Sequence, residues 1–363
     1  MVEIRLSRRH FLYQAGMLGG MCLLSPTAFV DAGTCPEMSG KKMRWIVPYS
    51  PGGGYDIYSR LITPFLEERL NSRIRVENEP GGGGTLGAYK IARARPDGLT
   101  LGLINAGGLL AASLSGKAKV PNPVEDFSIL GRVVRSRQLW VTAQNSGLKT
   151  MKDVLIESKK RPIIFAISDV GSTNFVNVAV ASNILSIRSE YVAGYPGSRE
   201  TSMAVLRGEA DIMALTFESG LDRIEAGDLR PLLQITAERI SPHDSLEDVA
   251  VLGGSQGLAA SRADETGGDR DEHIALASAL ISTTRAGRLI VAPSGLDKNV
   301  LNCMEHGLYE SLTDPAFIAA ASKARRSLDV ADGVSTRADI LTAVGKADKL
   351  APMVAKAIEK ARS

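Results

Sequence analysis

The stretch that decides the fold is residues 43–105, MRWIVPYSPGGGYDIYSRLITPFLEERLNSRIRVENEPGGGGTLGAYKIARARPDGLTLGLIN. It contains one unit twice: an apolar or alternating run (43–49, then 73–78), a glycine-rich break (50–54, then 79–84) and a segment with apolar residues at helical spacing. A further apolar run at 99–104 reads as a strand. This order predicts parallel strands with both glycine loops at their carboxyl ends, where open α/β sheets bind small ligands.

The two glycine loops have a physical use at that edge. Glycine has no β-carbon, so its backbone adopts positive φ and approaches a ligand closely. At a helix N-terminus the first N–H groups have no partner within the helix, and they and the helix dipole favour an anion. We therefore expect a carboxylate or a phosphate group at these loops. A β-branched side chain at Gly53 should obstruct the site.

Three motifs in this part of the chain resemble the signatures of a known family. They are VPYSPGGGYD at 47–56, VENEPGGG at 76–83 and ARPDGLTL at 94–101. In this order and at this spacing the chain is similar to the tripartite tricarboxylate transporter receptor family, the Bug or TctC-like periplasmic solute-binding proteins. The resemblance implies an α/β fold of the type 2 periplasmic binding protein class, in which two α/β lobes are joined by a hinge and enclose a ligand cleft. It places the first lobe at 43–140 and 285–363 and the second at 141–284.

The resemblance also implies a function. A receptor of this family captures a small carboxylate ligand by lobe closure and delivers it to membrane transporter subunits of the tripartite tricarboxylate type. We accordingly expect no enzymatic activity, no cofactor, no metal and a monomeric protein. A ligand-binding sensor component is the alternative that uses the same site.

The N-terminus predicts export. Arg8 and Arg9 precede a mildly apolar stretch, 15–24, and small residues follow up to Ala32. This pattern is typical of a cleavable signal, and the arginine pair indicates the twin-arginine route. We expect residues 1–32 to be removed and the protein to reside in the periplasm.

The candidate ligand-binding residues come from the glycine loops and from matching segments further along. They are Ser50, Pro51, Gly52, Gly53, Asp56, Gly82, Gly83, Thr85, Asn105, Gly171, Ser172, Thr173, Asn174 and Tyr195. Four have a structural alternative: Asn105 as a polar turn residue, Ser172 and Thr173 as helix caps, and Tyr195 as a buried tyrosine. We expect Asp56 to hold its loop rather than to contact the ligand.

The chain departs from the family at the far end of the expected pocket. The family commonly has a histidine and a glutamate on the helix after Ser172, where this chain has Phe175 and Ala179, and polar residues at the positions of Leu215 and Thr216. We expect this end to be less polar than in relatives. The family is usually shorter at 240–285, and 261–272 has the composition of a charged surface loop.

Two motifs suggest other functions. Gly253-Gly254-Ser255-Gln256-Gly257 fits the G-x-S-x-G turn of a serine hydrolase, with His273 or His306 and Asp264 or Asp271 as partners. An exported hydrolase is therefore the enzymatic alternative, although it leaves the two earlier glycine loops unexplained. A dinucleotide fingerprint at 82–87 lacks the acidic residue that binds a ribose about 20 positions later.

Composition excludes several further classes. The formal charge of +3 over 363 residues gives no argument for nucleic-acid binding. Outside the leader the cysteines are Cys35 and Cys303, which an oxidising periplasm permits to pair. Cysteine and histidine are not clustered at metal-ligand spacing. After the leader, no apolar run is long enough to cross a bilayer.

Overall fold

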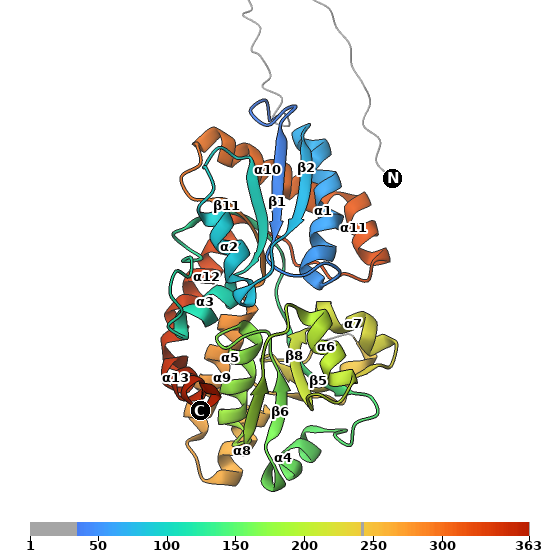
Figure 1. Cartoon of the computed structure of the whole chain (residues 1–363), viewed down its shortest axis with the longest axis vertical. Coiled ribbons are helices and arrows are strands. Elements are labelled where there is room, and N and C mark those ends of the chain that lie inside the picture. Colours follow the sequence, from blue (N-terminus) through green and yellow to red (C-terminus); the bar gives the residue numbers. More distant parts are fainter. Residues whose placement is uncertain (1–34, 241–242, 363) are drawn as a thin grey trace, which may run out of the picture. The chain divides into compact units, whose positions relative to one another are not determined.

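The computed structural model describes residues 35–240 and 243–362, and the expected export signal at 1–32 lies outside them. The first sheet contains the stretch that decides the fold (Figure 1). Its strands are β1 (Lys42–Val47), β2 (Arg73–Asn78), β3 (Thr100–Asn105), β4 (Phe127–Val134), β11 (Arg288–Pro293) and β12 (Ala331–Asp332). They lie in the order β12-β4-β11-β3-β1-β2, and β1 runs parallel to both β2 and β3. The predicted parallel unit is confirmed.

The helices of the first sheet follow its strands closely. They are α1 (Gly54–Leu70), α2 (Thr85–Ala92), α3 (Ala106–Leu114), α10 (Lys298–Thr313), α11 (Pro315–Lys323) and α12 (Gly333–Ala347). The core includes Trp45 of β1, which is fully buried and donates from Nε1 to Ser59 Oγ of α1 at 2.8 Å. This bond satisfies the indole N–H and fixes α1 against the strand that precedes it.

The second sheet is built in the same way. Its strands are β5 (Gln138–Ala143), β6 (Ile163–Ala166), β7 (Ser189–Val192), β8 (Ile212–Thr216), β9 (Leu229–Ile235) and β10 (Ala250–Val251), in the order β10-β9-β5-β8-β6-β7. Its helices are α4 (Met151–Lys160), α5 (Thr173–Ile184), α6 (Ser198–Leu206), α7 (Phe217–Glu225), α8 (Leu258–Thr266) and α9 (Arg270–Arg285). Parallel pairs join β6 to β7 and to β8, so loops that lead into α5 and α6 share one edge. The two-lobed α/β fold is confirmed.

The apolar residues 130–142 are divided between β4 and β5, which belong to different sheets and are separated by residues 135–137. One local expectation is wrong. The charged segment 261–272 is largely helical, because Ala263 packs into the core and Asp269 caps α9 by accepting from the amides of Asp271 and Glu272. Helical periodicity is hidden there because the buried positions are alanines.

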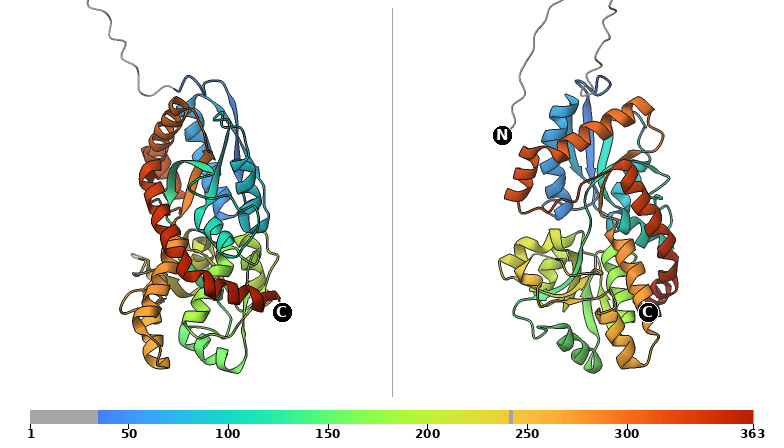
Figure 2. Two further views of the ribbon diagram at one scale, coloured as in Figure 1. Left: turned by 90° about the vertical axis from the view of Figure 1, so that its left-hand side faces the viewer. Right: turned by 180° about the vertical axis from the view of Figure 1, so that it is seen from behind.

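The C-terminal helix α13 (Ala351–Arg362) packs on the second lobe. Val354 and Ile358 share an apolar cluster with Val176 and Val180 of α5. α13 therefore packs with the second lobe, although the sequence assigned all of 285–363 to the first. The other lobe limits stay a prediction. In Figure 2 the red C-terminal helices follow one another from α12 to α13.

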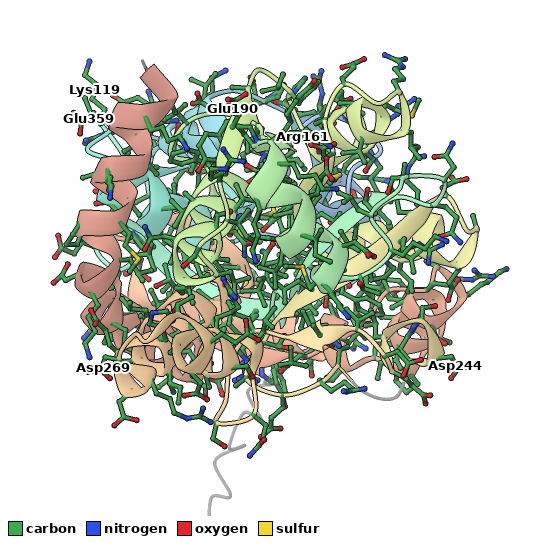
Figure 3. All side chains as sticks on the ribbon, turned by 90° about the horizontal axis from the view of Figure 1, so that it is seen from below. Lys119, Arg161, Glu190, Asp244, Asp269 and Glu359 are labelled. Atoms are coloured by element: carbon green, nitrogen blue, oxygen red, sulfur yellow. A yellow bond between two sulfur atoms is a disulfide. The ribbon has the colours of Figure 1, made fainter. Side chains whose placement is uncertain are left out.

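Charged side chains are distributed over the surface. Lys119, Arg161, Glu190, Asp244, Asp269 and Glu359, which Figure 3 labels, are all exposed. Within the described residues, no helix combines the length and the apolarity that a bilayer-spanning segment requires.

Cys35 and Cys303 form a disulfide, with 5.5 Å between their Cα atoms. The bond links the segment before β1 to α10, across a sequence separation of 268 residues. The pairing that the sequence left open is therefore present.

Candidate functional site

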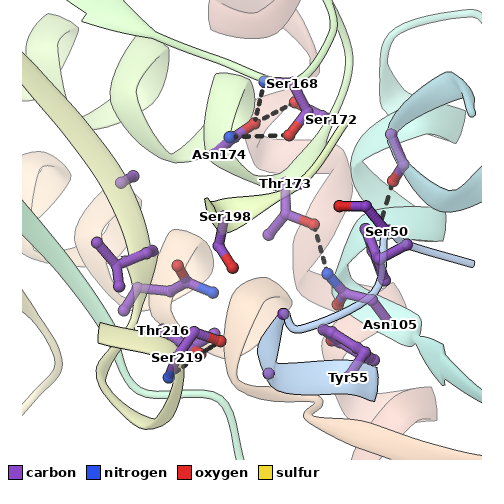
Figure 4. Close-up of a pocket in the computed structure, with 18 residues that line it drawn as sticks. Ser50, Tyr55, Asn105, Ser168, Ser172, Thr173, Asn174, Ser198, Thr216 and Ser219 are labelled. Atoms are coloured by element: carbon purple, nitrogen blue, oxygen red, sulfur yellow. Dashed lines mark hydrogen bonds between the residues drawn. The ribbon is translucent and has the colours of Figure 1, made fainter. Parts of the chain in front are cut away.

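Several helices begin at one cavity of about 80 Å³ (Figure 4). Its walls contain the N-terminal residues of α1, α3, α5, α6 and α7 together with Gly83 from the loop before α2. α1 and α3 follow strands of the first sheet, whereas α5, α6 and α7 belong to the second. The cavity thus lies between the lobes, and helix N-termini from both face it.

Two of these N-termini have no side-chain cap. α1 begins after Gly53 and α6 begins after Gly197, and neither glycine offers an acceptor to the first-turn amides. A β-carbon on Gly53 would lie 3.7 Å from Ser198 Oγ, so the two helix starts are close neighbours. Uncapped N–H groups and the positive ends of two helix dipoles make this part of the wall favourable for an anion.

The start of α5 is held by its own side chains. Ser172 Oγ caps the helix by accepting from Phe175 N at 3.3 Å, and Asn174 Nδ2 donates to Ser168 Oγ at 3.2 Å. Asn105, the cap of α3, donates from Nδ2 to Thr173 Oγ1 at 2.9 Å (Figure 4). Ser172 and Asn105 therefore cap helices and line the cavity at once.

The loop before α2 touches the opposite lobe. Its four glycines, 81–84, all have positive φ, a conformation that other residues rarely adopt. A β-carbon on Gly83 would lie 2.9 Å from Ser172 Cβ. Glycine is thus required here both by the backbone and by the close approach of the second lobe.

Polar contacts also join the lobes at the rim of the cleft. Ser50 Oγ donates to Glu200 Oε2 at 3.1 Å. Lys117 donates to Gly82 O of its own lobe at 3.4 Å and forms an ion pair with Asp169 of the other lobe. The Ser50–Glu200 and Lys117–Asp169 contacts exist only when the lobes meet, so the structure represents the closed arrangement.

The cavity wall carries no charged side chain, and its tyrosines are neutral donors. Burial raises the pKa of Tyr49 to about 12 and raises the pKa of Tyr55 further above its usual range. Tyr49 Oη donates to Gly83 O at 3.4 Å. At neutral pH the wall therefore offers hydroxyl and amide donors without a carboxylate that would repel an anion.

Asp56 holds the first glycine loop. Its carboxylate accepts from Gly52 N at 2.9 Å, Asn78 Nδ2 at 3.0 Å and Arg60 Nε at 3.0 Å. Burial opposes ionisation, but these hydrogen bonds and the Arg60 charge outweigh it, and the pKa of Asp56 lies below its usual value. Asp56 is not in the cavity wall.

Asp56→Ala should lower the free energy of unfolding by about 1–3 kcal/mol at pH 7, because three donors lose a charged acceptor. A lowered folded-state pKa contributes stability above the ordinary carboxyl pKa of about 4, and this contribution is lost as the pH falls through the folded-state value. Urea denaturation should therefore give a difference between wild type and variant that shrinks below about pH 4. The same difference at pH 7 and pH 3 would contradict this role.

The structure brings only part of the predicted set together. Ser50, Gly53, Gly83, Asn105, Ser172, Thr173 and Asn174 line the cavity, whereas Pro51, Gly52, Asp56, Gly82, Thr85, Gly171 and Tyr195 do not. Tyr195 donates instead to Glu209 Oε2 at 3.0 Å, and Thr85 Oγ1 donates to Gly82 O at 2.9 Å. Gly171 packs against Ser115, which lies 2.7 Å from where a β-carbon would be. Ligand contact by the lining residues stays a prediction.

Sequence reasoning missed a second group of lining residues. They are Tyr49, Gly54, Tyr55, Gln138, Ser168, Gly197, Ser198, Ala214, Leu215, Thr216 and Ser219. Gly54 lies in the glycine loop at 50–54 where an anion was expected, and Leu215 and Thr216 were noted only as departures from the family. Gly197-Ser198 repeats the pattern of a strand, a glycine and a helix start, so this signal was available. Gln138 begins β5 and carried no such signal.

The residues that make the far end of the cavity less polar are only partly those that the sequence indicated. Phe175 and Ala179 are buried in the apolar cluster around α5 and do not line the cavity. Ala214 and Leu215 of β8 supply the apolar wall. The Gln138 amide has no side-chain hydrogen bond within the described residues and is the polar group at this end.

The hydrolase motif forms no triad in the described part of the chain. Ser255 is exposed in a turn, and its carbonyl accepts from Arg270 Nη2 at 2.6 Å. Its hydroxyl makes no hydrogen bond to a histidine of residues 35–240 or 243–362. A nucleophilic serine needs such a base.

The family model described as "Tripartite tricarboxylate transporter family receptor" matches residues 59–261. BugT of Bordetella pertussis is 26% identical over 230 residues, which cover 62% of this chain and 68% of that protein. The structure of the periplasmic binding protein BugD superposes with a TM-score of 0.67 at 21% identity, over 89% of this chain and 98% of the other. The structure of R. palustris Rpa4515 with adipate gives a TM-score of 0.69 at 17% identity, over 86% and 97% of the two chains. Both structures share the fold described above.

Proposed function

The chain belongs to the tripartite tricarboxylate transporter receptor family, and we propose that it captures a small organic acid in the cavity between its lobes. The observation that carries this proposal is the uncapped pair of helix starts at Gly53 and Gly197. Each presents first-turn N–H groups without a side-chain acceptor, and a carboxylate supplies acceptor oxygens of the right charge. Adipate bound to the structural neighbour Rpa4515 fits the same class of ligand.

The mechanism is capture by closure. Donors from α1 belong to the first lobe and donors from α5 and α6 to the second, so a carboxylate meets all of them only in the closed arrangement. A ligand that binds the closed state preferentially shifts its population. The Ser50–Glu200 and Lys117–Asp169 contacts at the rim add to the stability of this state.

Membership of the family supports a cellular role in solute uptake. The protein acts in the periplasm, which it reaches through the signal in residues 1–32, and delivers its ligand as a monomer to tripartite tricarboxylate-type membrane subunits. It performs no chemistry on the ligand. The uncharged hydroxyls and amides in the cavity wall support binding, and among the described residues they include no base positioned beside a nucleophile.

A thermal-shift screen tests the proposal. Purified protein is mixed with acetate, succinate, malate or adipate, and separately with the primary amide of each acid. At least one acid should raise the melting temperature in a concentration-dependent way and leave the solution as unchanged acid. No shift with any acid, or turnover of an ester that Ser255→Ala abolishes, would reject the receptor in favour of the hydrolase.

A further inference from the structure

Arg288 is a buried cation without an acidic partner. It lies on β11, is fully buried, and its guanidinium carbon is 4.8 Å and 4.7 Å from the ring centroids of Tyr55 and Tyr58. Its Nε and Nη1 have no hydrogen-bond partner, and no carboxylate of the described residues forms an ion pair with it. A guanidinium carries a positive charge in proteins.

A buried arginine on the neighbouring strand is paired with carboxylates, as buried charges usually are. Arg132 of β4 is 2% exposed, and its Nη1 lies 2.6 Å from Asp339 Oδ2 while its Nη2 lies 3.5 Å from Asp329 Oδ1. Buried charges are normally compensated in this way, because an isolated charge in a protein interior is costly. Arg288 has no such carboxylate partner, so a negatively charged group from outside the chain would compensate its charge.

Arg288 is hydrogen-bonded to two residues of the cavity wall. Nη2 donates to Thr216 Oγ1 and to Ser219 Oγ, both at 2.8 Å, and both residues line the cavity (Figure 4). Thr216 caps α7 and Ser219 lies in its first turn, in the lobe opposite β11. The positive charge is therefore joined to the cavity wall only when the lobes are closed.

The number of donors around the two hydroxyls determines which acceptor each hydroxyl donates to. Thr216 Oγ1 already accepts from Arg288 and from Ser219 N at 3.2 Å, so its own hydrogen is donated to Ser219 Oγ at 2.9 Å. Ser219 Oγ then accepts from Arg288 and Thr216, which fills both of its lone pairs. Its hydrogen is left to donate to the contents of the cavity.

We infer that Arg288 is the positioning residue that selects a carboxylate over a neutral group of the same shape, acting through the hydroxyl of Ser219. This inference rests on the proposed function, because it concerns the ligand of the same cavity. The guanidinium supplies the uncompensated charge, and Ser219 presents it as a donor that is stronger toward an anion than toward an amide oxygen.

The test compares Kd values of succinate and adipate with those of succinamide and adipamide by calorimetry. Arg288→Met should weaken carboxylate binding by about 10- to 100-fold, the cost of losing a hydrogen bond polarised by a charge, and amide binding by less than about 3-fold. Arg288→Lys should recover part of the preference. The ligand-free Arg288→Met protein should melt no lower than wild type, because an apolar side chain replaces an unpaired buried charge.

Arg132→Met is the matched control. It removes a buried guanidinium that is already paired with Asp329 and Asp339, so it should lower the melting temperature and leave the preference for acid over amide unchanged. Ser219→Ala keeps the guanidinium and removes its contact with the ligand, and it should reduce the same preference.

The outcomes separate this inference from the proposed function. Wild-type protein that binds none of the four acids of the screen overturns both. Wild-type protein that binds an acid, together with Arg288→Met and Ser219→Ala variants that keep the full preference for acid over amide, overturns the role of Arg288 alone. A lower melting temperature of ligand-free Arg288→Met with unchanged selectivity would assign Arg288 a structural role instead.

Discussion

Gly54→Ala should weaken carboxylate binding by roughly 10- to 100-fold in a protein that remains folded. A β-carbon at this position would lie 2.3 Å from Ser219 Oγ and 2.8 Å from Arg288 Nη2. Both groups are fixed by hydrogen bonds to each other, so they cannot move aside cheaply. The closed arrangement must therefore loosen where α1 of the first lobe meets α7 of the second.

The fold should tolerate the same change. Gly54 is the first residue of α1 and does not have positive φ, and alanine is a better helix former than glycine. The tighter contact, with Ser219, lies between the lobes and therefore opposes closure, whereas the contact with Arg288 Nη2 lies within the first lobe. Calorimetry should show the weaker Kd, and circular dichroism should show unchanged helix content.

Gly53→Ala is the matched comparison at the adjacent position. Its β-carbon would lie 3.5 Å from Ser50 O and 3.7 Å from Ser198 Oγ, which are ordinary contacts. The loss of affinity should be several-fold smaller than for Gly54→Ala. Equal losses in the two variants would show that the spacing between Gly54 and Ser219 does not limit closure. The expectation that a β-branched residue at Gly53 obstructs the site stays a prediction, and for a single β-carbon the tighter position is Gly54.

Removing the Cys35–Cys303 disulfide should lower the free energy of unfolding by about 2–4 kcal/mol. The bond spans a sequence separation of 268 residues, and cross-linking a long loop restricts the unfolded chain strongly. Urea denaturation of the Cys35→Ser, Cys303→Ser double variant should show the lower midpoint. Dithiothreitol should lower the wild-type midpoint to a similar value.

Two controls make this second prediction specific. Dithiothreitol should not lower the midpoint of the double variant further, because Cys22 is then its only cysteine. The Kd for a carboxylate should stay within about 2-fold of wild type, since neither cysteine lines the cavity. A wild-type midpoint that is insensitive to dithiothreitol, with thiol titration confirming reduction, would contradict a stabilising role for the bond.

Local features of the sequence predicted the first sheet and much of the site. The alternation of apolar runs, glycine breaks and helical spacing in 43–105 placed β1, β2 and β3 and the loops between them. Ser50, Gly53, Gly83 and the segment 172–174 were found because each lies in a loop before a helix start, and such loops have a recognisable composition.

Residues whose importance depends on the opposite lobe were missed. Ser219 faces the cavity because α7 meets α1 across the cleft, and nothing within its own segment indicates this. Arg288 reads in the sequence as one polar residue at the start of an apolar strand. Its lack of an acidic partner becomes visible only when its neighbours in space are known.

The sequence by itself determined the fold class, the family and the glycine loops, because strand and helix periodicity and positive φ are properties of neighbouring residues. Only the tertiary structure decided that Gly54 is the tight contact, that α13 packs on α5, and that Arg288 lies behind the cavity wall without a counter-charge. The physical reason is that these features are distances and charge balances between segments far apart along the chain, which become defined when the two lobes come together.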